Sequence, residues 1–415
     1  MMEILKGVRV LDLSHVVAGP LASYYLAQLG AEVIKIEPPG GEVMRAASRT
    51  PGVGDQFATL NAGKRSLAVD IRTPEGAAIV RDLAKNATVF LENFRPGVMA
   101  RHGLDEAAIR AVNPDIVYCS ISGFGQEGAW AGRPAYDQIV QAVTGMMMMG
   151  GNEGDPPVKV GFPVIDVAVG LLGALSVVSA LYARLTQGRG LRIDASMVSA
   201  AMALMHTYAA GSMTAREPHT RTGNRGFTGS PGSDVFRCAD GWISVAANTP
   251  AQFRSLTAVL GIEDLCADGR ILDLEAFNAA SAGFVRPLDF AAARRRLEDA
   301  FLRHSAADIE ARLLERSVPT GRVRTLNEFI DAASPDNLVL SGSSFDQDGH
   351  PMRTPGLGFR ITGGGDTTSA GAPRLGESGA ALLRELGRSE AEIERLVASG
   401  VVRCPEETIS ATATA

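Results

Sequence analysis

The sequence predicts an α/β fold, with a doubly wound parallel sheet in a large domain and a smaller α+β domain later in the chain. Three observations predict this class. Short runs rich in Val and Ile alternate with helical patterns in the first third of the chain. Two long apolar helical patterns follow, and then a polar, glycine-rich stretch. A hairpin pattern with further helices comes after that stretch.

The expected strands of the large domain are short, apolar and rich in β-branched residues, which favour strands. They are Val8–Leu13, Ala31–Ile36, Leu67–Ile71, Ala87–Leu91 and Ile116–Ile121. Helical patterns between them cover Ala22–Leu29, Thr73–Ala84 and Asp105–Val112. Alternation of this kind is typical of parallel βαβ units and hence of a Rossmann-like sheet.

The later elements define the domain boundaries. Long helices are expected at Gly161–Arg184 and Ala195–Ala209, a hairpin at Asp234–Ala247, and helices near Pro250–Leu260, Ala291–His304 and Ala306–Glu315. A strand at Gly356–Ile361 and a helix at Ala380–Ala398 would return to the large domain, and Ser410–Ala415 would fray. The predicted organisation is 1–213 for the first part of the large domain, 214–233 linker, 234–318 small domain, 319–342 linker and 343–415 for the return.

Composition narrows the functional classes. The chain has 415 residues, 46% of them hydrophobic, and a formal net charge of −6, so nucleic acid and anionic membrane surfaces are disfavoured as partners. No secretory h-region opens the sequence, and the four cysteines form no metal-binding pattern. The apolar run Val167–Tyr182 is short for a bilayer span and is expected to be a core helix. We therefore expect a cytoplasmic protein without a metal or a membrane partner.

The sequence lacks the common nucleotide-binding motifs. Leu13-Ser14-His15-Val16-Val17-Ala18-Gly19-Pro20 follows the first strand, where a dinucleotide-binding fold would carry GxGxxG. No GxxxxGK[ST] occurs either. Ordinary NAD binding and P-loop chemistry are therefore disfavoured.

Asp166 is the strongest candidate for a catalytic residue. It lies in Val160-Gly161-Phe162-Pro163-Val164-Ile165-Asp166-Val167, between two apolar stretches. A buried charge is costly unless it is satisfied, and a helix N-terminus can stabilise a carboxylate. Asp166 is therefore either a helix-capping residue or a nucleophile in a dry pocket.

Further candidates surround this residue in the sequence. Glycines flank the apolar turn of Gly145–Gly154, which indicates either a mobile lid or a surface loop filled by methionine. Lys64, Arg65, Arg95 and Arg101 lie near strand ends, where cations suit phosphate. Tyr136 and Asp137 precede an apolar helix, and His15 is the histidine expected near the pocket.

These motifs resemble the class III CoA-transferases, a family that includes formyl-CoA transferase and L-carnitine CoA-transferase and is related to α-methylacyl-CoA racemase. The matching stretches run in order along almost the whole chain: VRVLDLSHVVAGP, LAQLGAEVIKIEPPGG, LNAGKRSLAVDI, LENFRPGVMARHGL, GRPAYDQIVQAVTG, GFPVIDVAVGLLGAL, DVFRCADGWISVAANTPAQF, VPTGRVRTLNEF and LGESGAALLRELGRSEAEIERL.

The resemblance implies a function and a set of site residues. Asp166 matches the family's catalytic aspartate, which forms a mixed anhydride with the donor acid and then a CoA thioester. The matching CoA-binding positions are Val17, Ala18, Lys64, Asn93, Phe94, Arg101 and Tyr136. His15, Met148, Gly150 and Gly151 would line the substrate or act as the lid. Pro38-Pro39 stands where formyl-CoA transferase has an arginine, so that phosphate contact is missing.

The resemblance also implies an interlocked homodimer and a small carboxylic acid as acceptor, with succinyl-CoA as one candidate donor. His15 or Arg225 would bind the acceptor's distal carboxylate. The related racemases use a His-Asp pair where this chain has Tyr136-Asp137, and a glutamate where it has Ala247-Asn248-Thr249. Because racemisation needs two bases, transfer is favoured over epimerisation. A non-catalytic CoA-binding protein and a nucleotide-linked oxidoreductase are the remaining alternatives.

Overall fold

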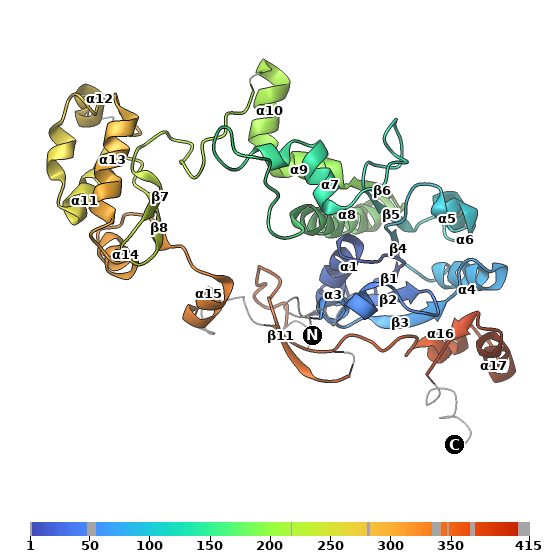
Figure 1. Cartoon of the computed structure of the whole chain (residues 1–415). Helices are drawn as coiled ribbons and strands as arrows, with labels where there is room; N and C mark the ends of the chain where they lie inside the picture. The colour runs from blue at the N-terminus through green and yellow to red at the C-terminus, as the bar shows by residue number, and fades with distance from the viewer. Residues whose placement is uncertain are drawn as a thin grey trace. The chain divides into compact units, whose positions relative to one another are not determined.

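The computed structural model describes residues 2–47, 55–216, 218–279, 283–333, 342–346, 348–365 and 370–405. The chain divides into two compact units (Figure 1). Unit 1 contains 1–147, 159–218 and 335–415, and unit 2 contains 148–158 and 219–334. The segment 148–158, which the sequence assigned to the large domain, groups with unit 2.

Unit 1 is built on a seven-stranded sheet with the order β12-β3-β2-β1-β4-β5-β6. Its strands are β1 Arg9–Asp12, β2 Glu32–Glu37, β3 Arg65–Val69, β4 Val89–Glu92, β5 Val117–Ser122, β6 Arg192–Ser196 and β12 Val402–Arg403. Neighbouring strands are parallel except β12, which pairs antiparallel with β3. The predicted mixed α/β class with a mostly parallel sheet is confirmed. From β1 the chain adds β2 and β3 on one side of the sheet and β4, β5 and β6 on the other, so the direction of winding reverses between β1 and β4.

Helices cover both faces of the sheet because its strands are apolar on both sides. Val10 and Leu11 of β1 illustrate this, since they belong to different buried cores. One core joins the sheet to α1 Ala18–Gln28, α8 Val164–Gln187 and α9 Met197–Leu204. The other joins it to α4 Pro74–Ala84, α6 Glu106–Val112, α16 Gly379–Glu385 and α17 Glu390–Ala398. The remaining helices of unit 1 are α2 Met44–Ala47, α3 Gln56–Asn61, α5 Val98–Arg101, α7 Asp137–Val143 and α10 His206–Ala215.

Three sequence predictions in unit 1 are wrong. The expected helix Ala195–Ala209 begins as strand β6 and is then interrupted at Met205 between α9 and α10. Gly356–Ile361 is not a strand; a hairpin of β10 Gly342–Phe345 and β11 Pro351–Thr354 precedes it. Ala380–Ala398 forms two helices, because Gly387 has a φ of 78° and a capping box at Ser389 starts α17. The predicted fraying of Ser410–Ala415 lies outside the described residues.

Helix α8 is longer than the apolar run from which it was predicted. It has 24 residues and a mean hydropathy of 2.2 over its most apolar stretch, so its length and composition alone would allow it to cross a membrane. The expectation that this segment is too short is therefore wrong. Half of that stretch is buried within the described chain, and α8 packs on α1, α9 and the sheet. Such packing is typical of a core helix.

Unit 2 is a small α+β body with an antiparallel sheet of β7 Ser233–Arg237, β8 Trp242–Ala246 and β9 Thr320–Arg322. Its helices are α11 Pro250–Leu260, α12 Leu274–Asn278, α13 Phe290–Phe301, α14 Ala306–Glu315 and α15 Leu326–Ala332. Phe236, Phe253 and Phe301 lie in its core. The hairpin pattern expected at Asp234–Ala247 corresponds to β7 and β8.

Candidate active site

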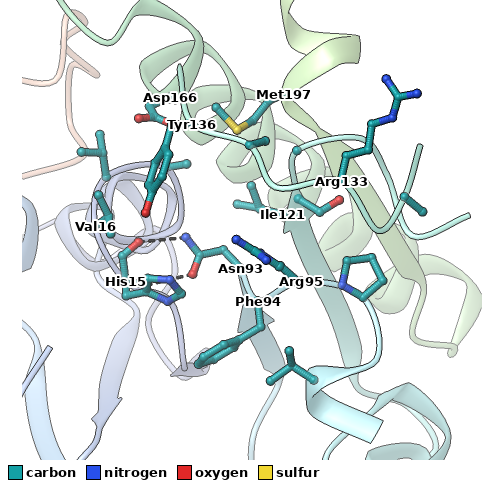
Figure 2. Close-up of a pocket in the computed structure, with 18 residues that line it drawn as sticks. His15, Val16, Asn93, Phe94, Arg95, Ile121, Arg133, Tyr136, Asp166 and Met197 are labelled. Carbon is teal, nitrogen blue, oxygen red and sulfur yellow. Dashed lines mark hydrogen bonds between the residues drawn. The ribbon is translucent and has the colours of Figure 1, made fainter. Parts of the chain in front are cut away.

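A cavity of about 460 Å³ lies in unit 1 where the carboxyl ends of β1, β4 and β5 meet (Figure 2). This is the reversal point of a doubly wound sheet, the usual ligand position in such folds. The cavity is lined by His15, Val16, Val17, Ala18, Asn93, Phe94, Arg95, Pro96, Val98, Ile121, Ser122, Gly123, Ala131, Arg133, Ala135, Tyr136, Asp166 and Met197.

Asp166 lies in the first turn of α8 and faces this cavity (Figure 2). The carboxylate that caps α8 belongs to Asp137 and not to Asp166. Oδ2 of Asp137 accepts hydrogen bonds from the backbone N of Ile165 (2.7 Å) and of Asp166 (3.1 Å). Asp137 is itself held by Gln141, whose Nε2 lies 2.5 Å from Oδ1. The Asp166 side chain is therefore not needed as a cap.

The surroundings of Asp166 favour its neutral form. Burial, together with the smaller effect of the nearby Asp137 carboxylate, raises the pKa of Asp166 to about 7. The shift occurs although a helix N-terminus lies beside it, because desolvation penalises the charged form strongly. A carboxyl group with this pKa in a cavity is a functional-site candidate on physical grounds.

The opposite wall of the cavity is made by the turns after β1 and β4. The backbone N of His15 donates to Oδ1 of Asn93 at 2.9 Å, and Nδ2 of Asn93 donates to the His15 carbonyl at 2.8 Å. The His15 and Phe94 rings lie 5.0 Å apart. Tyr136, 71% exposed, extends from the Asp166 side toward this reciprocal pair (Figure 2). Of the positions implied by the resemblance, Val17, Ala18, Asn93, Phe94, Tyr136 and His15 thus line the cavity with Asp166.

Lys64 requires a correction. Its ammonium is fully buried and lies 2.7–3.0 Å from four oxygens, those of Asp12, Pro20, Ser23 and Asn61. Since an ammonium has only three N–H donors, no donor is left for a phosphate. Lys64 is thus a buried structural partner of Asp12 and is not among the described residues that line the cavity.

Arg101 is exposed at the end of α5 and is not among the described residues lining the cavity. Two other arginines, Arg95 and Arg133, occupy the wall instead. The guanidinium of Arg133 lies 4.1 Å from the centre of the Trp130 ring, which orients it. The sequence drew attention to both segments but gave no reason to prefer these arginines, and it gave no signal for Ile121 or Met197.

The lid candidates Met148, Gly150 and Gly151 belong to unit 2. The guanidinium of Arg221 anchors their segment, donating to the carbonyl oxygens of Gly150 at 2.6 Å, of Asp155, and of Pro156 at 3.1 Å. Arg225, the other candidate for the acceptor carboxylate, lies over the Phe290 ring within unit 2, 4.0 Å from its centre.

A second, mostly apolar cavity of about 290 Å³ lies at the carboxyl ends of β2 and β3 in unit 1. It shares Phe94 and Val98 with the first cavity, and Arg72 and His102 lie among its lining residues. An elongated ligand could therefore occupy both. For metal ions, the described residues offer one cluster, Asp346, Asp348 and His350. Hydrogen bonds within the β10–β11 turn account for its geometry.

Comparison with known proteins decides the family. The model of CoA-transferase family III matches residues 5–379. The chain belongs to this family. It is 35% identical over 396 residues to an acetyl-CoA:oxalate CoA-transferase from Acetobacter aceti, covering 93% of this chain and 96% of the relative. It is 32% identical over 403 residues to a succinate–glutarate CoA-transferase from Agrobacterium fabrum, covering 92% and 95%.

A solved structure agrees with the fold. A CAIB/BAIF family protein from Brucella suis superposes with a TM-score of 0.77 at 31% identity, covering 93% of this chain and all of that one. The resemblance inferred from the motifs is confirmed, and the chain is an enzyme of the CoA-transferase class. Family III transferases act on CoA thioesters, so acyl-CoA is a substrate.

Proposed function

We propose that Asp166 is the covalent nucleophile through which this enzyme moves CoA from an acyl-CoA donor to a small carboxylic acid. The observation that carries the proposal is the position of Asp166: a partly buried carboxyl group, released from capping by Asp137, in the cavity at the reversal point of the sheet. A carboxylate there can reach a ligand bound in the cavity and act as a nucleophile when ionised.

The reaction balances as four substitutions. The Asp166 carboxylate attacks the acyl carbonyl and the C–S bond breaks. CoA leaves as the thiolate, and the product is a mixed anhydride of Asp166 and the donor acid. The thiolate attacks the Asp166 carbonyl, the donor carboxylate leaves, and an aspartyl-CoA thioester remains. The acceptor carboxylate then attacks this thioester and expels the thiolate. Finally the thiolate attacks the acceptor's acyl carbonyl, which frees Asp166. Splitting one exchange into activated steps conserves the thioester energy.

CoA suits the paired cavities. The thioester end would lie beside Asp166, with the pantetheine chain passing Asn93 and Phe94. The nucleotide end would occupy the apolar second cavity, where Arg72 and His102 can meet phosphate. Shared lining at Phe94 and Val98 supports one continuous path. The Met146–Gly151 segment is the proposed lid that excludes water.

The acceptor would be a small acid such as oxalate, glutarate or mesaconate, the acids in the names of the relatives, with succinyl-CoA as one candidate donor. In addition to His15, the cavity offers Arg95 and Arg133 for a second carboxylate. Guanidinium groups recognise carboxylates in bidentate fashion, so we favour these two over Arg225.

We also propose a cytoplasmic homodimer, interlocked as the family resemblance implies, without a membrane partner. Large apolar side chains of α8 are exposed on the described chain: Leu171, Leu172, Leu175, Tyr182 and Leu185. An exposed group of large apolar side chains on one helix is typical of an interaction site. A second copy of the chain is the occupant that we propose for this face.

The test uses the purified protein with succinyl-CoA and a panel of acids. Mass spectrometry of the Asp166 peptide, quenched during turnover and trapped with hydroxylamine, should show a hydroxamate on Asp166. Asp166→Asn should lower kcat by at least about 10³-fold, because no covalent path remains. An unmodified peptide during turnover, or full activity of Asp166→Asn, would refute the mechanism. Rapid α-hydrogen exchange of a 2-methylacyl-CoA in deuterated water would favour an epimerase instead.

A further inference from the structure

Val16 has an unusual backbone conformation in the wall of the active-site cavity. Among the described residues, the non-glycine positions with positive φ are Val16, Arg216 and Ser317, and Val16, at 68°, is the β-branched one. A β-branched residue in the left-handed region is a true outlier with a cost of about 1–3 kcal/mol. Such a conformation persists only where neighbouring contacts enforce it.

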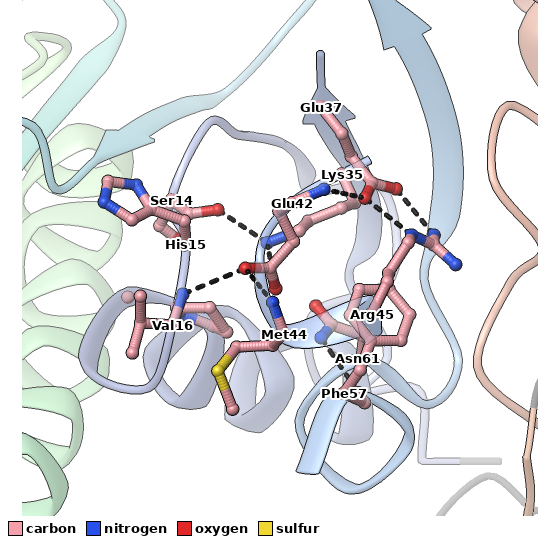
Figure 3. Close-up of polar contacts among 12 residues, drawn as sticks. Ser14, His15, Val16, Lys35, Glu37, Glu42, Met44, Arg45, Phe57 and Asn61 are labelled. Atoms are coloured by element: carbon pink, nitrogen blue, oxygen red, sulfur yellow. Dashed lines mark hydrogen bonds and ion pairs between the residues drawn. The ribbon is translucent and has the colours of Figure 1, made fainter. Parts of the chain in front are cut away.

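The contact that enforces it comes from Glu42 (Figure 3). Oε2 of Glu42 accepts hydrogen bonds from the backbone N of Val16 at 3.2 Å and of Met44 at 3.3 Å. Oε1 of Glu42 lies 3.7 Å from Nζ of Lys35. That ammonium donates at 2.5 Å to the carbonyl oxygen of Ser14. The Lys35–Glu42 ion pair therefore holds the turn between β1 and α1 at two backbone groups, the carbonyl oxygen of Ser14 and the N–H of Val16.

This ion pair is expensive to bury. The Lys35 and Glu42 side chains are 0% and 4% exposed. Oε1 of Glu42 has no hydrogen-bond partner among the described residues, so its desolvation is only partly offset. A buried pair of this quality is weak evidence for stability and better evidence for a specific geometry. The geometry it fixes is that of Val16, whose side chain packs on the cluster containing Met44.

The fixed turn leads directly into the cavity. Val17 and Ala18 follow Val16, and no side chain of the described chain caps the N-terminus of α1 that begins there. His15, on the other side of Val16, carries the backbone groups that pair with Asn93. A change of φ at Val16 would therefore move both the start of α1 and the His15–Asn93 pair relative to Asp166.

We propose that Glu42 is a positioning residue for the transfer reaction: it holds Val16 in the left-handed conformation and so sets the cavity wall that faces Asp166. The inference rests on the proposed function for its activity readout. Glu42 does not line the cavity, so its action on the substrate is indirect.

The test is a rescue by glycine, which adopts positive φ without cost. Glu42→Ala should lower kcat/KM by about 30-fold, the equivalent of about 2 kcal/mol. Adding Val16→Gly should restore kcat/KM to within about threefold of wild type, because the turn no longer needs enforcement. If the loss of Glu42 only destabilised the fold, adding Val16→Gly would not restore kcat/KM. Crystal structures of the two variants should show a negative φ at Val16 in the first and a positive φ at Gly in the second.

Arg45→Met is the matched control. Arg45 lies in the same segment and donates to the buried Glu37 at 2.6 and 2.7 Å, and it is not among the described residues that line the cavity. It should lower stability while leaving kcat/KM within about threefold of wild type. If Glu42→Ala does not fold, Lys35→Met/Glu42→Leu, which removes both charges, replaces it in the comparison.

Three outcomes would overturn the inference: wild-type activity without Glu42, failure of Val16→Gly to rescue a folded variant, or an unchanged Val16 φ in the Glu42→Ala crystal. A wild-type protein that transfers no CoA would instead refute the proposed function, and the crystallographic comparison would still judge the role of Glu42.

Discussion

At the scale of single residues, the charge of Asp137 contributes to the raised pKa of Asp166. Burial and the Asp137 charge together raise the pKa of Asp166 to about 7. Because the nucleophile is the ionised form, kcat/KM should fall as pH drops through that value. Asp137→Asn removes one of the two raising causes, so the acidic limb of the pH profile should move to lower pH. The measurement is kcat/KM for acyl-CoA between pH 5 and 9.

The matched control for this change is Asp289→Asn, which alters another helix-capping carboxylate, at the start of α13 in unit 2. Its pH profile should coincide with that of wild type. An unshifted limb in Asp137→Asn would show that the charge of Asp137 does not govern the nucleophile.

Lys64 and Arg101, two cations that the resemblance places at the CoA site, differ in burial and should therefore differ in their effect on stability. Lys64→Met leaves Asp12 buried without its partner and should lower the free energy of unfolding by about 3–5 kcal/mol. Arg101→Met, at an exposed site, should change it by less than about 0.5 kcal/mol. Urea denaturation of both variants measures the difference. Selective loss of acyl-CoA affinity in a fully stable Lys64→Met would contradict the structural role.

Residue-level prediction from the sequence succeeded where position along the chain determines the environment. Asp166, Asn93 and Phe94 follow strand or helix boundaries that the pattern locates, and all reach the cavity. Lys64 also follows this rule, yet its side chain turns inward to Asp12. The direction of a side chain depends on tertiary partners, and strand periodicity does not record them. The enforced turn at Val16 was invisible for the same reason.

At the scale of elements, α8 approaches α1 closely through a glycine. A Cβ added at Gly170 would lie 2.8 Å from the carbonyl oxygen of Ala18 and 3.1 Å from Leu21. Gly170→Ala should therefore lower the free energy of unfolding by about 1–3 kcal/mol, since the backbone must move apart. Its KM for acyl-CoA should rise because Ala18 lines the cavity.

Gly211→Ala is the matched control within helix α10, where the described chain brings no atom within 4 Å of the added Cβ apart from the neighbouring residues and the backbone of the helix itself. That substitution should stabilise the protein by up to about 1 kcal/mol through helix propensity. Thermal unfolding of both variants distinguishes packing from propensity. Equal shifts of the same sign would contradict the close approach.

Element boundaries were predicted well where a cap or a proline is written in the sequence. Thr73-Pro74 starts α4 as expected, with the hydroxyl accepting from Gly76. The prediction failed at Ala195 and Ser196, which end strand β6 although the sequence predicts helix from Ala195. So short a segment carries too little periodicity to distinguish strand from helix. The single helix predicted over Ala380–Ala398 is wrong because Gly387, with its positive φ, ends the first of two helices.

At the scale of the whole molecule, the exposed apolar face of α8 predicts self-association. Leu175 is 62% exposed, and Leu175→Glu places a charge in the centre of that face. The dissociation constant of the proposed homodimer should rise more than about tenfold. Sedimentation equilibrium measures this, with Leu302→Glu in unit 2 as the control at a similarly exposed leucine. A monomeric wild type would refute the dimer proposal.

Arg221 bears on how this protein can be divided into fragments. Its guanidinium donates to the carbonyl oxygens of Gly150, Asp155 and Pro156, which lie more than 60 positions earlier in the chain. A recombinant piece covering only 219–334 would present that cation with none of these acceptors. An excised small unit should therefore express well only when the 148–158 peptide is supplied, either fused through a short spacer or added in trans.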